Sequence, residues 1–263
     1  MSRPRCDYLA ETLEHETRLQ LCGRLVVRID GHRLEQDFPS RQGRLLFVYL
    51  AVNRLRPIER DELAEAIWPD RPPAAPDASL NALLSKLRHV LGPTRIPQRG
   101  EIRLVLPPDA FVDLEAAAEA IHRAESAVRR ESWVEAWGPA RVALHTALRG
   151  FCPGEHTPWI VEQRRQLEEV ALRAYECIAS SGLALAGSEL DAAKRAAHAL
   201  IKQMPYRESG YRHLIEILRL EGNDAEALTV YDRLRTLLRS ELGATPSPAT
   251  QELHRRLLGS AGE

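Results

Sequence analysis

The chain has 263 residues, of which 44% are hydrophobic and 28% are charged, enough to bury one large core or two ordinary ones. Its 36 Lys and Arg almost balance its 37 Asp and Glu, which excludes a uniformly basic surface but not a local basic face. We find no apolar run near the roughly 18 residues of a membrane helix, and residues 1–18 carry too many charges for a signal peptide. The four cysteines stand far apart without a CxxC pair, so we expect no disulfide framework, no zinc site and a cytoplasmic location.

Charge is distributed unevenly along the chain. Residues 1–106 hold 17 basic and 14 acidic residues, whereas residues 107–263 hold 19 basic and 23 acidic ones. Within residues 79–106 there are five basic residues and a single acid, Glu101. The pattern predicts a basic front module and an acidic body, although imbalances of this size also arise by chance.

The front module begins with strand signals. Leu19–Ile29 is rich in β-formers, and Asp30-Gly31 favours a two-residue hairpin turn because both positions tolerate positive φ. His32–Phe38 is the expected partner strand. Ser40 is a plausible N-cap for a first helix that should end near Asn53.

Two more helices and a hairpin follow. The second helix is expected from Arg60 to Trp68, and four prolines make residues 69–76 a stiff loop. A third helix, capped by Asp77, should run to Leu91 and stop at Gly92-Pro93. Residues 95–106 can form a closing hairpin with Gly100 near its tip. Strands, three helices and a terminal hairpin are the elements of an α+β winged helix-turn-helix.

The third helix has two distinct faces. At about 100° per residue, one stripe collects Leu80, Leu84, Leu87 and Leu91. The opposite face has no acidic residue and includes small side chains, as a helix in a DNA major groove requires. For base edges we nominate Asn81, Ser85, Arg88 and His89. For phosphates we nominate Lys86, Arg99, Arg103, and Arg41 or Arg44. The simpler interpretation is a solvated amphipathic helix.

From residue 113 onward the pattern is helical throughout. Glycine and proline breakers separate seven stretches, which implies antiparallel helical hairpins. The expected helices are 113–130, 132–148, 159–181, 189–204, 207–221, 224–242 and 248–258.

The spacing of two alanines indicates a repeat. Ala193 and Ala227 lie 34 residues apart at similar places in the second helices of adjacent pairs, and 34 is the tetratricopeptide period. Pro205 and Tyr231 follow them where that repeat expects a proline and an aromatic residue. Ala136 has a similar place but lies 57 residues before Ala193. A plain helical bundle is the alternative.

Signals for catalysis are weak. The chain has no GxxxxGK[ST], GxGxxG, HExxH or GxSxG motif, and its nine histidines are scattered. We therefore expect no enzyme activity, no cofactor and no metal site.

Several spaced motifs, taken together, resemble a known family. In the front module these are Asp30-Gly31, RQGRLLFVYLA from Arg41, DELAEAIWP from Asp61, and ASLNALLSKLRHVLG from Ala78. In the rear they are WIVEQRRQLEE from Trp159, MPYRESGYRHLIEIL from Met204, EGNDAEALTVYDRL from Glu221 and ELGATPSPATQEL from Glu241. Their order resembles the antibiotic regulatory protein family of bacterial activators, which joins an OmpR/PhoB-type winged helix to a bacterial transcriptional activation domain.

The resemblance implies a domain plan and a function. We expect an N-terminal extension at 1–18, a winged-helix DNA-binding domain at 19–106, and tetratricopeptide-like helical hairpins at 107–263. It implies a sequence-specific transcriptional activator that binds direct repeats in promoter DNA and contacts RNA polymerase. A homodimer on DNA is the possible assembly, and no membrane partner is expected. The 69–76 loop is the candidate polymerase contact.

One departure from the family pattern keeps an alternative open. The family's Gly-Tyr in the wing is replaced here by Gly100 followed by Glu101 and Ile102. A protein-interaction adaptor whose winged helix no longer reads DNA is therefore the second hypothesis.

Overall fold

A computed structural model describes residues 17–260, and within them the chain forms two compact units. The front unit comprises the chain up to Ala116 together with Arg149–Leu167, and the rear unit comprises Ala117–Leu148 and the chain from Glu168 onward. Residues 1–16 of the extension predicted at 1–18 lie outside the described part of the chain. Arg18, the last residue of that predicted extension, is already the first residue of a strand. None of the helices in the described part is both long and apolar enough to cross a membrane.

The front unit contains a small sheet of four strands in the order β3-β2-β1-β4. β1 (Arg18–Gln20) pairs antiparallel with β2 (Val26–Ile29), which pairs with β3 (His32–Arg33). β4 (Phe111–Val112) pairs in parallel with β1 and forms one edge of the sheet. This edge strand comes from about 90 residues further along the chain than β1.

The turn predicted at Asp30-Gly31 is confirmed, because both residues have positive φ, 49° and 81°. The long strand predicted over 19–29 is wrong, since Gly23, with a φ of 76°, reverses the chain between β1 and β2. The return strand is also shorter than expected and ends at Arg33.

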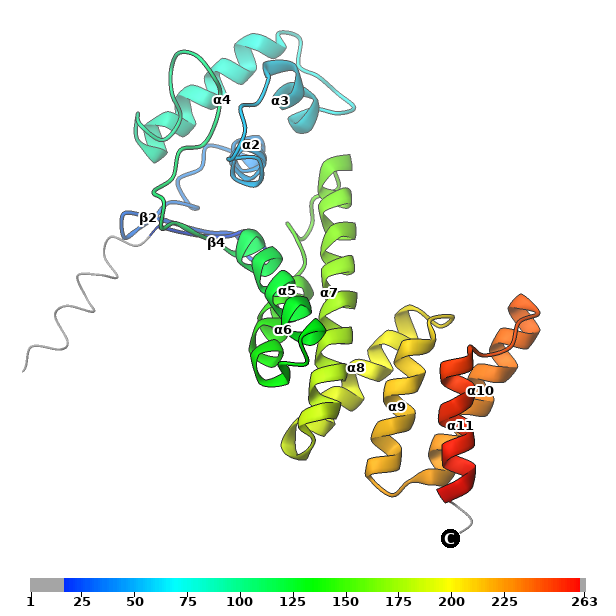
Figure 1. Cartoon of the computed structure of the whole chain (residues 1–263). Helices are drawn as coiled ribbons and strands as arrows, with labels where there is room; N and C mark the ends of the chain where they lie inside the picture. The colour runs from blue at the N-terminus through cyan, green and yellow to red at the C-terminus, as the bar shows by residue number, and fades with distance from the viewer. Residues whose placement is uncertain (1–16, 261–263) are drawn as a thin grey trace, which may run out of the picture. The chain divides into compact units, whose positions relative to one another are not determined.

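The front unit also contains three helices (Figure 1): α2 (Arg41–Val52), α3 (Arg60–Ile67) and α4 (Pro76–Leu91). The predicted cap of α2 is confirmed, because Ser40 Oγ accepts a hydrogen bond from the Gly43 amide at 3.1 Å. The predicted cap of α4 is wrong. Ala75 is the N-cap, Pro76 occupies the first turn where its missing N–H costs nothing, and Asp77 lies inside the helix.

The closing hairpin predicted over 95–106 does not form two strands. One backbone bond, from Val105 N to Arg95 O at 2.8 Å, ties the loop together. Ile102 pairs instead with Ile58, with its carbonyl accepting the Ile58 amide at 2.9 Å. The loop is thus fastened to the body of the unit by the link before α3 rather than by its own second arm.

A segment from the middle of the chain packs with the front unit. The Gly23 amide donates to Gly150 O at 2.7 Å, and Cys22 forms a β-bridge with Phe151. The Trp159 indole nitrogen donates to Ala66 O at 3.0 Å. The predicted linear boundary between 106 and 107 does not coincide with the observed division, because this segment returns after the first helical hairpin.

The helices predicted after residue 112 are present within a few residues of their expected ends. They are α5 (Asp113–Arg129), α6 (Trp133–Leu148), α7 (Pro158–Leu185), α8 (Leu190–Gln203), α9 (Glu208–Leu220), α10 (Asp224–Leu242) and α11 (Pro248–Ser260). Gly182 does not end α7 as expected. It lies inside the helix, where its missing side chain admits Ala193 of α8.

The alanines that suggested a repeat occupy equivalent places. Ala136, Ala193 and Ala227 are each the fourth residue of α6, α8 and α10, and each is fully buried. A methyl group at this place lets paired helices approach closely. Figure 1 shows α8, α9, α10 and α11 side by side, as the predicted helical repeat requires.

Candidate nucleic-acid interface

α4 separates its leucines from its polar side chains as predicted. The four leucines at 80, 84, 87 and 91 are buried, and Leu83 lies at the edge of the stripe. The opposite face is exposed along the helix at Asn81, Ala82, Ser85, Lys86 and His89. The leucine stripe anchors α4 to the body of the front unit, so the polar face is held rigidly toward solvent.

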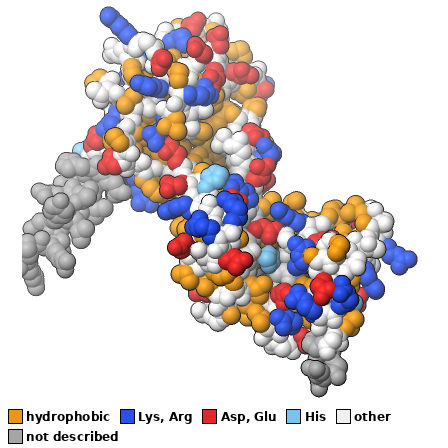
Figure 2. Space-filling model, in the orientation of Figure 1, with side chains coloured by type: hydrophobic (Ala, Val, Ile, Leu, Met, Phe, Trp, Pro, Cys, Tyr) orange, Lys and Arg blue, Asp and Glu red, His pale blue; other side chains and the backbone are white. Residues whose placement is uncertain are grey.

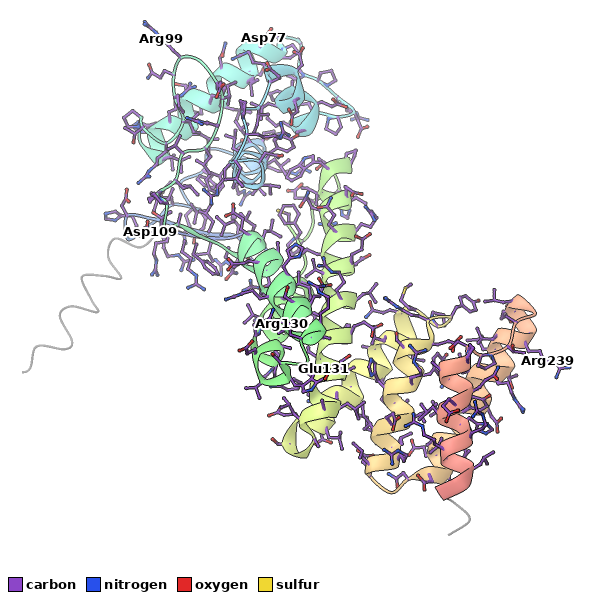
Figure 3. All side chains as sticks on the ribbon, viewed as in Figure 1. Asp77, Arg99, Asp109, Arg130, Glu131 and Arg239 are labelled. Carbon is purple, nitrogen blue, oxygen red and sulfur yellow. The ribbon has the colours of Figure 1, made fainter. Side chains whose placement is uncertain are left out.

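Ser85, Lys86 and His89 are free to contact a partner. Their side chains make no hydrogen bond or ion pair with any other residue between 17 and 260. The acid within α4, Asp77, lies in its first turn, which Figure 3 shows at the far end of the helix from the 92–106 loop. A cation on this face therefore has no acidic neighbour on the helix beyond the first turn.

Asn81 is engaged by a residue that sequence reasoning did not single out. Arg60 Nη2 donates to Asn81 Oδ1 at 2.8 Å, and Arg60 Nε lies 3.6 Å from Asp77 Oδ1. A bidentate contact to adenine needs that amide oxygen as an acceptor and the amide nitrogen as a donor. Asn81 can make it only if Arg60 releases the oxygen.

Arg88, which we predicted to contact a base edge, is engaged by the chain itself in this structure. It is half-buried, and its guanidinium donates to Ile96 O at 3.0 Å and to Pro97 O at 2.8 Å. Burial and the nearby Arg60 lower the pKa of Arg88, but no carboxylate pairs with it in the described chain. In this structure Arg88 fixes the loop after α4, which places it as a positioning residue.

The 92–106 loop presents two cations. Arg99 and Arg103 are exposed, and neither side chain contacts a described partner by a hydrogen bond or ion pair. Arg99 points away from the ribbon (Figure 3). Ile96, Ile102 and Leu104 are buried and hold the loop from within, while Arg95 pairs with Asp30 at 2.8 Å. The loop is therefore anchored at its base and basic at its surface.

The two arginines of α2 differ. Arg41 pairs with Glu155, with Nε donating to Oε1 at 3.0 Å and to Oε2 at 2.9 Å. Arg44 is exposed and has no side-chain partner in the described chain. Of the predicted pair, only Arg44 has its guanidinium available for a phosphate. Sequence reasoning missed Glu155 because it lies 114 residues away.

Among residues 17–260, no three His, Cys, Asp or Glu side chains are grouped so as to hold a metal ion. Burial raises the pKa values of Cys152 and Cys177 to about 12, which keeps these thiols protonated and poor nucleophiles. Figure 2 shows acidic and basic side chains interspersed over the visible face of each unit.

Comparison with known proteins defines the class. Residues 112–258 match the bacterial transcriptional activator domain, and this match extends over more than half of the chain. The chain therefore belongs to the bacterial transcriptional activator domain family.

Individual relatives agree with this class. The chain is 30% identical over 264 residues to the transcriptional regulatory protein EmbR of Mycobacterium tuberculosis (strain ATCC 25618 / H37Rv), covering 94% of this chain and 64% of that protein. It is 32% identical over 235 residues to the regulatory protein AfsR of Streptomyces coelicolor, covering 87% of this chain and 23% of that one. A transcriptional regulatory protein MoaR1 of Mycobacterium tuberculosis is 24% identical and is covered over 83% of its length. The chain thus spans less than two thirds of EmbR.

A solved structure shows the same fold. Mycobacterium tuberculosis EmbR in complex with a low-affinity phosphopeptide superimposes with a TM-score of 0.72 at 24% identity, covering 94% of this chain and 65% of that one. At this identity the likeness speaks for the fold alone.

Proposed function

We propose that the chain is a sequence-specific DNA-binding transcriptional regulator that acts as an activator, with a front unit of the OmpR/PhoB winged-helix type. The single observation that carries the proposal is the exposed face of α4, where Ser85, Lys86 and His89 have no partner in the described chain. The family match and the names of the relatives support it.

The proposed docking follows from the geometry of the front unit. α4 has 16 residues and is about 24 Å long at the usual rise, long enough to lie in a major groove. Ser85 and His89 are small or flat and can approach base edges, while Lys86 on the flank reaches a phosphate. Arg99 and Arg103 on the loop, and Arg44 on α2, supply further phosphate contacts.

A salt titration tests this proposal. We expect the chain to bind the DNA upstream of its own gene more tightly than a scrambled duplex of equal length. Each phosphate contact contributes about one unit to the dependence of log K on log salt, so Lys86→Ala should lower that slope by about one. Lys194→Ala is the matched control, because Lys194 is paired with Glu221 in the rear unit. Equal affinity for both duplexes would favour the adaptor hypothesis.

Activation requires a polymerase contact as well as DNA binding. We propose that homodimers bind direct repeats and that the 69–76 loop contacts RNA polymerase. Asp70 and Arg71 are exposed in that loop. Asp70→Ala with Arg71→Ala should reduce transcription in vitro from a bound promoter without weakening DNA binding. A parallel loss of DNA affinity would instead assign the loop to the DNA interface.

We propose no catalytic activity for this chain. If it were a nucleotide-driven switch, ATP with magnesium would raise its melting temperature by preferential binding to the folded state. We expect no shift at millimolar ATP, measured by differential scanning fluorimetry.

A further inference from the structure

The rear unit contains an open groove between α8 and α10, with α9 at its floor. Its volume is about 930 Å³. Tyr211, Ile201 and Leu237 provide an apolar floor, and Thr229, Thr236 and Ser240 provide hydroxyl groups along α10. All the residues that line the groove belong to the rear unit, and none of them is among the residues proposed to contact DNA.

The cations that line this groove are unpaired. His198, Lys202 and Arg233 are exposed, and their side chains make no hydrogen bond or ion pair with another described residue. The one acid in the lining, Asp232, is neutralised by Arg235 at 3.1 Å. The wall of the groove therefore carries two positive charges and a histidine, and its one carboxylate is already paired.

A tyrosine hydroxyl lies at the floor of the same groove. Tyr211 as a whole is 2% exposed, and its hydroxyl, which makes no hydrogen bond with another described residue, remains in contact with solvent. A ligand carboxylate or peptide carbonyl in the groove would replace water as the acceptor of this hydroxyl.

We propose that this groove binds an acidic peptide segment of a partner protein, one that alternates carboxylates with large apolar side chains. From Thr229 to Ser240 the wall of α10 rises about 16 Å, which matches about five residues of extended chain. The partner's carboxylates would face Lys202 and Arg233, and its apolar side chains would cover Ile201 and Leu237. This proposal is independent of the DNA-binding function.

The test uses the whole chain and a defined probe, a fluorescein-labelled octapeptide of alternating Asp and Leu. Binding is followed by fluorescence anisotropy, with a Lys-Leu octapeptide as the comparison. Charge reversal places like charges together, so Lys202→Glu and Arg233→Glu should each weaken binding at least about tenfold. Tyr211→Phe should weaken it about threefold because it removes only the hydroxyl.

Arg239→Glu is the matched control. Arg239 lies on the same helix, outside the groove lining, and points away from the other helices (Figure 3). This variant should bind within twofold of the unmodified chain, and circular dichroism should show that all variants keep their helices.

Three results would overturn the proposal. Equal binding of the Lys-Leu peptide would mean unspecific apolar contact. Full displacement by millimolar inorganic phosphate would mean a small-anion site. Unchanged affinity in both charge-reversal variants would remove the groove from the interaction.

Discussion

Arg88 illustrates how one residue can satisfy a sequence pattern and serve another purpose. It lies on the flank of the polar face of α4, where an arginine suits a guanine contact. In the folded chain its guanidinium spans the carbonyls of Ile96 and Pro97. The flank position brings the side chain within reach of the loop that follows the helix, and two fixed acceptors there outcompete solvent.

We therefore expect Arg88→Ala to destabilise the front unit by about 1 to 2 kcal/mol, because two hydrogen bonds from a charged donor are lost. Arg88→Lys should retain little of this stability, since a lysine ammonium lacks the planar set of N–H donors with which a guanidinium reaches two carbonyls. Urea unfolding measures the change, with Lys86→Ala as a neighbour that should stay within about 0.5 kcal/mol. Unchanged stability together with relaxed specificity at one base pair would return Arg88 to the base-reading set.

Glu62 provides a pH-dependent link between α2 and α3. The Tyr49 hydroxyl donates to its Oε1 at 2.6 Å, and Arg56 Nη1 donates to its Oε2 at 2.9 Å. Arg56 above all, with Tyr49, lowers the pKa of Glu62 to about 2. A carboxyl whose pKa is lowered by folding stabilises the fold above its unfolded pKa, and this stabilisation is lost as the pH falls toward the folded value.

Glu62→Gln should accordingly cost about 1 kcal/mol at pH 7, a figure reduced for the solvent exposure of Arg56. The difference from the unmodified chain should shrink between pH 5 and pH 3. Urea unfolding at pH 7, 5, 4 and 3.5 measures it. A difference that stays constant over this range would mean that the carboxylate charge contributes nothing.

At the scale of elements, periodicity predicted the helices well and the strands poorly. The boundaries of α10 agree at both ends with the sequence pattern. At the C-terminal end, Gly243 adopts a left-handed φ of 62° and ends the helix. The strands are only two to four residues long, and their pairing depends on residues far away, as β1 with β4 shows. Short strands carry too few residues for alternation to be distinctive.

Gly182 tests the packing of α7 against α8. A Cβ there would lie 2.9 Å from Ala193 Cβ and 3.0 Å from Glu189 O. Alanine normally stabilises a helix interior by about 1 kcal/mol relative to glycine. Here we expect Gly182→Ala to destabilise the rear unit by about 1 to 2 kcal/mol, because a backbone oxygen cannot move aside cheaply.

Thermal unfolding compares this variant with Gly259→Ala in α11, where an added Cβ meets no atom within 4 Å in the described structure. Gly259 lies in the last turn of α11, so that control should stabilise the chain by up to about 1 kcal/mol, the ordinary gain of alanine over glycine. A stabilising Gly182→Ala would show that α7 and α8 can separate without cost.

At the scale of the whole chain, the front unit depends on residues beyond the first helical hairpin. Trp159 meets the rings of Tyr49 and Phe151 edge-on, at 5.0 and 5.8 Å between centroids, and its indole donates to Ala66 O. We expect Trp159→Ala to destabilise the front unit by about 2 to 3 kcal/mol, since it removes a half-buried aromatic ring and one hydrogen bond.

Trp159→Phe separates these two contributions. It keeps an aromatic ring and should cost only about 1 kcal/mol, the value of the lost hydrogen bond. Guanidinium unfolding followed by circular dichroism measures both variants. If Trp159→Ala left the unfolding midpoint of the front unit unchanged, residues 149–167 would not be part of its stable core.

The amino-acid sequence by itself determined the helices, the leucine stripe of α4 and the exposed positions of Ser85, Lys86 and His89, because these depend on local periodicity and on where apolar side chains recur. Only the tertiary structure decided that Arg88 holds a loop, that Arg41 is paired with Glu155, and that residues 149–167 complete the front unit. Those contacts join residues that are near in space and mostly distant in the chain, and the choice among available acceptors is made by packing, which no local pattern encodes.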